Sequence, residues 1–379
     1  QTARKEKHSQ YRSFYVWCED DPGDTSDQVV FPGEQEGIWT YDEAAKAYYL
    51  RHCYHFQPDL NFANPLVRDE FRKIIGLWLQ QGVSGFRIDA AAFLIKLVGV
   101  ENTLGMDQAH AFLRDLEDFT TLRKGNAILL GEVDVAISTI ADYFGQGNEL
   151  KSLFNFPLNR FLFVALARES ADPIHFGLSE LPTIPAVGQW VNFLRHHDEL
   201  NLSRLPKEER EHIFAEFGPE PNMQIFGRGL RRRLAPMLNG DQRRIRLAYS
   251  MLFSLPGAPM IYYGEEIGMG ENLDVPGRLS VRTPMQWSSY GHGGFSSAPP
   301  DQFIRPMVHE GEYRCDQINV GGQRGKSGSL LNWIAALTRV RRECGEIGVG
   351  KWTALDVGTD AVLGLRYDVA DSAVIVFNN

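Results

Sequence analysis

The chain contains few cysteines, no long hydrophobic run and no excess of basic residues. Its four cysteines lie far apart and lack metal-binding spacing, which favours a reducing, cytoplasmic compartment. The longest apolar stretch, residues 247–259, is interrupted by serine, glycine and proline and falls short of the roughly 20 residues that span a bilayer. The formal net charge of -9 disfavours nucleic acid and anionic membranes as partners. Since the chain begins with Gln1, the sequence leaves a signal peptide open.

One basic run stands against this acidic background. It covers residues 228–233 within GRGLRRRLAP. Charge runs are usually solvated, so we expect the start of an exposed helix whose arginines pair with local carboxylates. The functional alternative is an arginine that lines a substrate entrance.

The composition is sufficient for a large core, because 43% of the 379 residues are hydrophobic. Short apolar strands alternate with amphipathic helices, a pattern that predicts parallel βα units and an α/β fold. Polar residues stand at the C-terminal end of each strand, which is the end that carries the active site in a (β/α)₈ TIM barrel. The expected strands cover residues 85–89, 127–133, 153–157, 190–198 and 259–266, and the expected helices include 64–82, 107–123 and 241–255.

Five such strands are visible, whereas a closed barrel needs eight. Either three strands precede Gln1 or the sheet is open and doubly wound. In the first case we expect an open arc of barrel strands 4–8 with exposed apolar edges, and a 379-residue polypeptide that is poorly soluble and nearly inactive in isolation. The predicted domains are a loop-rich lobe (1–60) inserted after barrel strand 3, the catalytic barrel (61–345), and the start of a C-terminal antiparallel β-sandwich (346–379) that begins after a helix over 329–344.

The strand tip GFRID carries an arginine and an aspartate two residues apart, Arg87 and Asp89. Alternation along a strand puts both side chains on one side. A neighbouring arginine would keep Asp89 ionised by lowering its pKa, as a nucleophilic carboxylate requires. The structural alternative is a buried ion pair.

A second carboxylate, Glu132, leaves the apolar strand LLGEV. A carboxyl that faces a partly apolar pocket has a raised pKa and is suited to be a general acid. Taken alone, a salt-bridged loop glutamate is equally compatible with the sequence. Retaining glycosidases place two carboxyls about 5–5.5 Å apart around the bond that they cleave.

A third tip, FLRHHDE, carries His197 and Asp198, which suit the binding of sugar hydroxyls. The pair His196–His197 raises the possibility of a metal, but neighbouring residues of a strand point to opposite faces, so we expect none. The aromatic residues Tyr54, Phe156, Tyr262 and Trp287 are candidate sugar-stacking walls, although for each one core packing is the ordinary explanation.

At these residues the sequence resembles the α-amylase family of retaining glycosidases and transglucosylases over nearly its whole length. The family's ordered segments stand here as QPDLN (57–61), GFRIDAAAF (85–93), LLGEVDV (129–135) and FLRHHDEL (193–200). The resemblance implies Asp89 as nucleophile, Glu132 as acid/base, Asp198 as third carboxylate, and Arg87 and His197 as substrate-binding residues. Segments such as GRGLRRRLAPML, LFSLPGAPMIYYGEEIGMG and SVRTPMQW are most similar to the trehalose synthase branch.

The sequence also departs from the family pattern. The family's segment with an Asp followed by Asn-His is absent, and that Asp and His normally complete the glucose subsite. His196 stands where the family usually has asparagine, and LGEVDV replaces the LAEAN of the trehalose synthase type. A structural calcium in a related enzyme uses the missing asparagine, an aspartate matching Asp59 and an acidic residue near Lys96. The lysine disfavours calcium, and no other cofactor is expected.

The resemblance implies a covalent glucosyl-aspartate intermediate and a small α-glucoside as substrate: maltose, trehalose or a short α-glucan. The expected reaction is interconversion of maltose and trehalose by intramolecular glucosyl transfer, and the alternative is hydrolysis of maltose or short α-glucans. A non-catalytic carbohydrate-binding relative would have degenerate carboxylates, whereas all three are intact. A nucleotide-binding protein would need a G-x-G-x-x-G turn after a strand, and the chain has none. The oligomeric state stays open.

Overall fold

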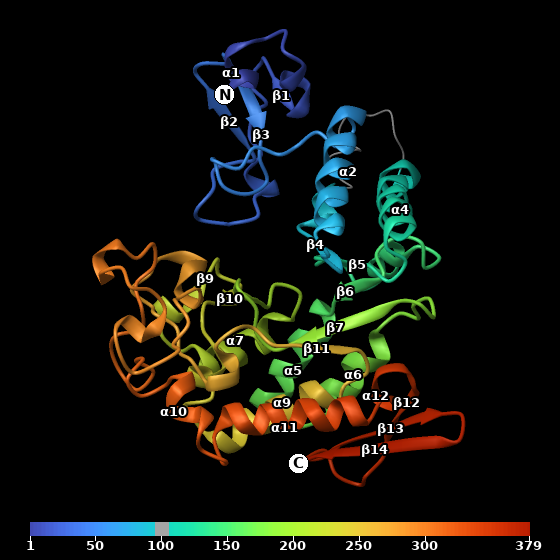
Figure 1. Cartoon of the computed structure of the whole chain (residues 1–379), viewed down its shortest axis with the longest axis vertical. Coiled ribbons are helices and arrows are strands. Elements are labelled where there is room, and N and C mark those ends of the chain that lie inside the picture. The colour runs from blue at the N-terminus through green and yellow to red at the C-terminus, as the bar shows by residue number, and fades with distance from the viewer. Residues whose placement is uncertain (95–105) are drawn as a thin grey trace. The chain divides into compact units, whose positions relative to one another are not determined.

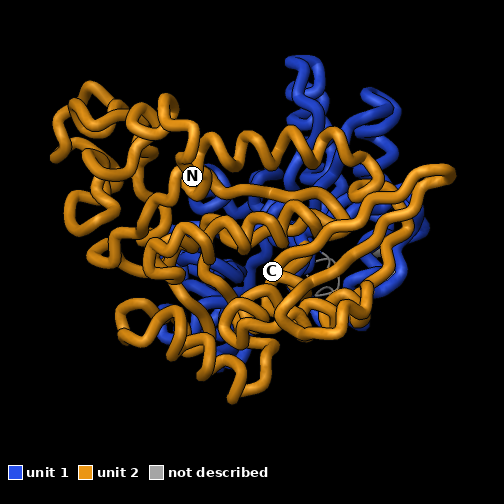
Figure 2. Tube along the Cα trace, turned by 90° about the horizontal axis from the view of Figure 1, so that it is seen from below, with its two compact units in different colours: residues 1–154, 182–189 blue, residues 155–181, 190–379 orange. Residues whose placement is uncertain are grey.

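A computed structural model describes residues 1–94 and 106–379 of the chain (Figure 1). The chain divides into two compact units, coloured separately in Figure 2. Unit 1 comprises residues 1–154 and 182–189, and unit 2 comprises residues 155–181 and 190–379. Lys96 lies outside the described residues. Among the described residues, none of the helices combines the length and apolarity that crossing a bilayer requires.

Unit 1 begins with the loop-rich segment, which contains a small antiparallel sheet that the sequence reading did not predict. Its order is β1-β3-β2, and the turn between Asp42 and Ala47 joins β2 to β3. The segment's elements are α1 (Thr2–Lys5), β1 (Trp17–Cys18), β2 (Trp39–Asp42) and β3 (Ala47–Leu50). Most of residues 1–60 lies outside these strands, in agreement with the expected loop-rich character.

The rest of unit 1 is built from βα units. Its parallel strands pair in the order β4-β5-β6, and the helices α2 and α4 lie side by side, joined by an ion pair between Arg72 and Asp115. The elements are α2 (Pro65–Gln80), β4 (Gly85–Ile88), α4 (Met106–Arg123), β5 (Ile128–Gly131) and β6 (Ser152–Phe154).

Helix α2 shows why these boundaries arise. The Asn64 side chain accepts a hydrogen bond from the backbone N–H of Leu66, and proline follows at the first helical position. At the other end, Gly82 lies two residues after the last helical residue, and its left-handed φ of +97° prevents the helix from continuing. The expected apolar stripe is only partly buried, because Ile74 and Trp78 are 49% and 50% exposed.

Unit 2 contributes the other two parallel strands, β7 and β11, which pair with each other. The first residue of β7 belongs to unit 1. The elements are α5 (Phe156–Arg168), α6 (Asp172–Glu180), β7 (Gln189–Phe193), β8 (Leu200–Asn201), α7 (Lys207–Phe217), β9 (Gln224–Ile225), β10 (Gly229–Leu230), α8 (Leu234–Met237), α9 (Gln242–Ser254) and β11 (Ala258–Met260). All five predicted parallel strands are therefore present.

All five strands are shorter than expected, and three of them end well before the predicted residue. The sequence predicted a strand over 153–157, but β6 ends at Phe154, because the Asn155 side chain caps α5 by accepting from Leu158 N–H. The strand expected over 190–198 ends at Phe193, so the His-His-Asp segment is a loop. The strand expected over 259–266 ends at Met260.

The C-terminal helix and antiparallel strands of unit 2 agree with the prediction. Helix α11 (Leu330–Glu343) is capped by Ser329, whose hydroxyl accepts from Asn332 N–H. An antiparallel sheet of β12 (Lys351–Leu355), β13 (Leu363–Val369) and β14 (Ser372–Asn378) comes after two short helices, α10 (Val320–Arg324) and α12 (Glu346–Val349). The core of unit 2 packs apolar residues of α5, α6, α9, α11 and β13 together, including Phe163, Ile174, Leu252, Ile334 and Tyr367.

Candidate active site

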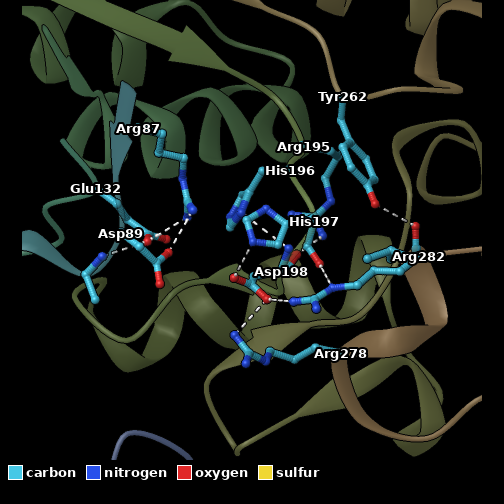
Figure 3. Close-up of polar contacts among 12 residues, drawn as sticks. Arg87, Asp89, Glu132, Arg195, His196, His197, Asp198, Tyr262, Arg278 and Arg282 are labelled. Atoms are coloured by element: carbon cyan, nitrogen blue, oxygen red, sulfur yellow. Dashed lines mark hydrogen bonds and ion pairs between the residues drawn. The ribbon is translucent and has the colours of Figure 1, made fainter. Parts of the chain in front are cut away.

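In unit 1, one arginine joins the two carboxylates that the sequence singled out (Figure 3). Nη1 of Arg87 lies 2.7 Å from Oδ1 of Asp89, and Nη2 lies 2.6 Å from Oε2 of Glu132. Arg87 belongs to β4, while Asp89 and Glu132 directly follow β4 and β5. The expectation that Arg87 and Asp89 share one side is confirmed. A fork of donors that grips both carboxylates fixes their orientation relative to each other.

Backbone geometry brings the two carboxylates together. Strands β4 and β5 pair in register, with Ile88 opposite Gly131, so both chains reach their ends at the same level. Ala90 then adopts a left-handed φ of +47°, and its N–H donates to Oε2 of Glu132 at 3.1 Å. The next N–H, of Ala91, donates to the Glu132 carbonyl. A non-glycine residue in this conformation is strained, and such strain clusters at functional sites.

The side chain of Glu132 is four-fifths buried, and this decides its protonation. Burial raises the pKa of Glu132 to about 7, the positive charge of Arg87 opposes the rise, and a hydrogen bond with Asp89 reinforces it. The prediction of a raised pKa at Glu132 is confirmed. Near neutral pH this carboxyl carries a proton that it can donate, whereas the Asp89 side chain is 75% exposed to solvent.

In unit 2, the Asp198 carboxylate is gripped by two arginines that the sequence reading missed. Oδ1 of Asp198 accepts from Nη1 of Arg278 at 2.7 Å and also from Nη2 of Arg282, and Oδ2 lies 3.2 Å from Nε2 of His197. Although burial raises the pKa of Asp198, the charge of Arg278, aided by His197, His196 and Arg282, holds it below its ordinary value. Asp198 is therefore ionised at neutral pH.

Arg278 and Arg282 both come from the segment around the 3₁₀ helix η6 (Gly277–Val281), about 80 residues after Asp198. Nε of Arg282 also donates to the His197 carbonyl at 2.8 Å. Arg282 belongs to the SVRTPMQW segment. The four-residue spacing of two arginines was the available signal, but nothing in it indicates the partner.

The reason given for excluding a metal at the two histidines is wrong. His196 and His197 lie in a loop, so strand alternation does not separate them, and their ring nitrogens and an Asp198 oxygen lie within 4.8 Å of one another. The charges nevertheless oppose a cation, because two guanidinium groups already occupy Oδ1 of Asp198. These residues therefore do not fit a metal centre.

The calcium position also fits poorly. Oδ2 of Asp59 already accepts from the backbone N–H of His52 at 3.0 Å and lies 2.5 Å from Nδ1 of that histidine. Among the described residues, Asp59 belongs to no group of three or more histidine, cysteine or carboxylate side chains near enough to share an ion. Its carboxylate instead fixes the His52 ring, which packs on Phe93.

The basic run differs from the expected solvated helix. Arg233 is 0% exposed, and the run contains a short strand, β10, in place of a helix start. The arginines do pair with carboxylates, but these are distant in sequence and not local as expected. Arg232 contacts Glu271 at 2.9 Å and Arg233 contacts Glu265 at 3.2 Å, 39 and 32 residues further along the chain. Buried charge is tolerated here because carboxylates and backbone carbonyls surround it.

The four candidate aromatic walls have different environments. Phe156 is buried against Phe193 and His196, as core packing predicts. Tyr262 donates to the Val281 carbonyl at 3.2 Å, and its ring faces the Arg233 guanidinium. Tyr54 stacks between two other rings of unit 1, and Trp287 is 51% exposed.

Comparison with protein families decides what this scaffold is. The family model "Alpha amylase, catalytic domain" matches residues 1–203 and 224–349. The chain belongs to the α-amylase family. The α-amylase of H. orenii covers 99% of this chain with a TM-score of 0.73 and 23% identity, and this chain spans 66% of that structure. Isomaltulose synthase from Erwinia rhapontici NX5 has a TM-score of 0.71 at 19% identity, with 99% of this chain and 70% of that structure aligned. These structures share the family's fold.

The more similar curated members of the α-amylase family are named trehalose synthases. The trehalose synthase of Pimelobacter sp. (strain R48) is 35% identical, with 100% of this chain and 68% of the relative aligned. That of Thermus thermophilus is 39% identical over 100% of this chain and 39% of the relative. The trehalose synthase/amylase TreS of Mycobacterium tuberculosis (strain CDC 1551 / Oshkosh) is 35% identical over 100% of this chain, which spans 64% of that protein's length.

Proposed function

We propose that this chain carries the catalytic machinery of a retaining α-glucoside-active enzyme that interconverts maltose and trehalose by intramolecular glucosyl transfer. The observation that carries the proposal is the bridging of Asp89 and Glu132 by Arg87 while Glu132 has a pKa of about 7. One carboxylate is exposed and ion-paired, and the other is buried and about half protonated at neutral pH. These are the two states that a nucleophile and a general acid need. Similarity to trehalose synthases supports the choice of substrate.

In the first step, the carboxylate oxygen of Asp89 attacks the anomeric carbon of the glucosyl unit. The glycosidic carbon–oxygen bond breaks, and the leaving oxygen takes the proton of Glu132. A β-linked glucosyl ester on Asp89 results, and Glu132 is left ionised. Arg87 then stabilises the new charge on Glu132, to which it is already hydrogen-bonded at 2.6 Å.

In the second step, a hydroxyl of the acceptor attacks the same carbon from the opposite side. Its proton passes to Glu132, and the ester bond to Asp89 breaks, which restores both carboxyls. If the acceptor is the anomeric hydroxyl of the glucose just released, the product is trehalose. We assign to Asp198 and His197 the binding of sugar hydroxyls, a role supported by the ionised state of Asp198.

The second candidate function is hydrolysis, in which water replaces glucose as acceptor. It is favoured by the mycobacterial relative whose name joins trehalose synthase with amylase, and by an α-amylase of Dictyoglomus thermophilum that is 26% identical. The balance depends on how well water is excluded from the covalent intermediate.

The test supplies maltose to the full-length gene product in the presence of ¹³C-labelled free glucose. Unlabelled trehalose as the main product supports intramolecular transfer. Labelled trehalose indicates intermolecular transfer, glucose alone indicates hydrolysis, and either outcome contradicts the proposal. Asp89→Asn should abolish turnover. The control is Asp69→Asn, which removes another aspartate of unit 1 that is exposed and paired with an arginine, at 2.6 Å from Arg72, and it should leave activity unchanged.

A further inference from the structure

Two buried arginines of unit 2, Arg195 and Arg233, hold the loop that carries Asp198 and the segment that binds its side chain. Arg195 precedes Asp198 by three residues and is 2% exposed. Its Nε donates to the Arg232 carbonyl at 2.7 Å. Its Nη2 donates to the carbonyl of Asp198, which lies beside it in Figure 3, at 2.8 Å. This one guanidinium therefore joins the backbone of the Asp198 loop to the backbone of the basic run.

A second buried arginine holds the segment that grips the Asp198 side chain. Nη2 of Arg233 donates to the Val281 carbonyl at 2.8 Å, and Nη1 donates to the Tyr263 carbonyl at 2.8 Å. Val281 immediately precedes Arg282, which binds both the Asp198 carboxylate and the His197 carbonyl. Arg233 thus fixes the backbone next to Arg282, whose side chain extends to Asp198.

Two glutamates pair with the arginines of the basic run. Glu265 is 3% exposed and pairs with Arg233, while its Oε2 also accepts from the Tyr249 hydroxyl at 3.3 Å. Glu271 accepts from Nε of Arg232 at 2.9 Å and from the backbone N–H of Arg233 at 2.8 Å. Burial of charged groups on this scale costs several kcal/mol per ion before compensation. A neutral apolar core would fill the same space without that cost.

Two nitrogens of the Arg195 guanidinium, Nε and Nη2, each donate to a backbone carbonyl. Its third nitrogen, Nη1, is buried without a hydrogen-bond partner among the described residues. What the side chain does achieve is a fixed distance between two backbone carbonyls, one of which belongs to Asp198.

We propose that Arg195 is a positioning residue for the reaction, and that it acts through Asp198 by fixing the backbone of that residue, with Arg233 fixing the opposing arginine Arg282. This inference rests on the function proposed above, in which Asp198 binds the substrate. Arg195 binds the backbone carbonyl of Asp198, and Arg278 and Arg282 bind its carboxylate. Pre-set orientation of this kind contributes to rate, because a displacement of about 1 Å can cost about a hundredfold.

The test replaces Arg195 in the full-length gene product and follows turnover of 4-nitrophenyl α-glucoside. Arg195→Met should lower kcat about a hundredfold with little change in KM, and Arg195→Lys should recover part of the loss because an ammonium can still reach one carbonyl. The decisive comparison is a double-mutant cycle. In an Asp198→Asn background, Arg195→Met should cost no further kcat, because its effect passes through Asp198.

Arg341 provides a matched control. This arginine of α11 also binds backbone carbonyls with its guanidinium, donating to Phe253 at 3.0 Å and to Gly257. Within the described part of the chain, its hydrogen bonds do not involve the Asp198 loop. Arg341→Lys should lower the melting temperature but not the kcat of the folded fraction. If Arg195→Lys only lowers the melting temperature in the same way, or if the two losses of kcat simply add in the double mutant, the proposal is overturned.

A second readout separates this inference from the proposed function. The Glu199 amide shares a peptide bond with the Asp198 carbonyl, so its resonance in ¹⁵N-glutamate-labelled protein reports the hydrogen bond from Arg195. We expect the resonance to shift in Arg195→Lys and not in Arg341→Lys. If the wild type turns over no α-glucoside, the proposed function fails, yet this shift still supports the role of Arg195 in holding the loop. An unmoved resonance overturns that role.

Discussion

The guanidinium of Arg87 lies 2.6 Å from Oε2 of Glu132, and yet Glu132 is the carboxyl whose pKa is raised, to about 7. Burial outweighs the favourable charge, because desolvation of the ionised form is the largest contribution. The arginine therefore does not keep Glu132 ionised. It limits the rise of the pKa, so that the proton is held at neutral pH and can still be released to a leaving group.

The first prediction concerns Arg87→Met. Loss of the positive charge should raise the pKa of Glu132 further, because the guanidinium that opposes the effect of burial is gone. A general acid works only when protonated, so kcat/KM of the wild type should fall above a pH of about 7, and this limb should move to higher pH in the variant. The overall rate should drop about 10²-fold or more, because the orientation of both carboxyls is lost.

The measurement is the pH profile of kcat/KM with maltose. Arg72→Met is the control, since Arg72 is paired with Asp69 and Asp115 of the same unit. Its profile should coincide with that of the wild type. A basic limb that moves to lower pH in Arg87→Met would show that Glu132 is not the group responsible.

The second prediction links Glu132 to stability. Its folded pKa of about 7 lies above the ordinary 4.5, so between these values the folded state binds more protons than the unfolded state. The free energy of unfolding must then decrease as pH rises through this window, and the cost reaches about 3 kcal/mol above pH 7. Glu132→Gln removes the cost, because glutamine is neutral at every pH.

Urea unfolding at pH 4.5 and pH 8 measures this difference. The variant should match the wild type closely at the lower pH and exceed it at the higher pH. Glu117→Gln is a useful control, because that buried glutamate pairs with Lys151 at 2.5 Å. The variant leaves this lysine without its carboxylate and should therefore be less stable than the wild type. Equal stability of Glu132→Gln and wild type at pH 8 would contradict a raised pKa.

The third prediction concerns Arg278→Met. This arginine makes the largest contribution that lowers the pKa of Asp198, against burial, which raises it. Without Arg278 the pKa of Asp198 should rise. Because activity needs the ionised form, it should then decline at a higher pH than in the wild type when the pH is lowered. The acid limb of the pH profile of kcat/KM should therefore move to higher pH.

Arg246→Met is the comparison, because that arginine of α9 donates to the Gly328 carbonyl and is not among the charges that act on Asp198. Its acid limb should be that of the wild type. An unchanged acid limb in Arg278→Met, together with normal folding, would mean that ionised Asp198 does not limit the reaction.

Local patterns predicted the framework and the first two carboxyls. The strand tips that carry Asp89 and Glu132 follow from alternation and apolar runs within a few residues. The partners of Asp198 could not be found in this way, because Arg278 and Arg282 lie about 80 residues further on. A strand predicted through the two histidines extended alternation past Phe193, where the ladder ends.

The basic run illustrates the same limit in energetic terms. A run of arginines is normally solvated, so the sequence favours an exposed helix. The groups that make burial possible for Arg233 are Glu265 and the carbonyls of Tyr263 and Val281, which lie 30 to 48 residues away in sequence. Only the tertiary structure brings these acceptors to the guanidinium.

The last prediction tests how strictly the backbone places the carboxyl pair. Gly85 begins β4, and a Cβ there would lie 2.3 Å from the Ile128 carbonyl oxygen of β5. Backbone atoms of a paired strand cannot move aside, so Gly85→Ala must separate β4 from β5 or twist β4. Arg87 and Asp89 follow two and four residues later, and the shift would reach them. We expect a loss of a few kcal/mol of stability and a decrease in kcat of at least about tenfold in the protein that still folds.

Gly125→Ala is the matched control, because a Cβ at that position meets no atom within 4 Å and Gly125 lies in the turn that precedes β5. The two variants would be compared by thermal unfolding and by kcat at a temperature where both are folded. Gly125→Ala should resemble the wild type in both measurements. If Gly85→Ala is less stable but keeps full kcat, the spacing of β4 and β5 matters to the fold alone. If the stability and the kcat of Gly85→Ala are both unchanged, β4 and β5 can move apart, which the close packing of the two backbones should forbid.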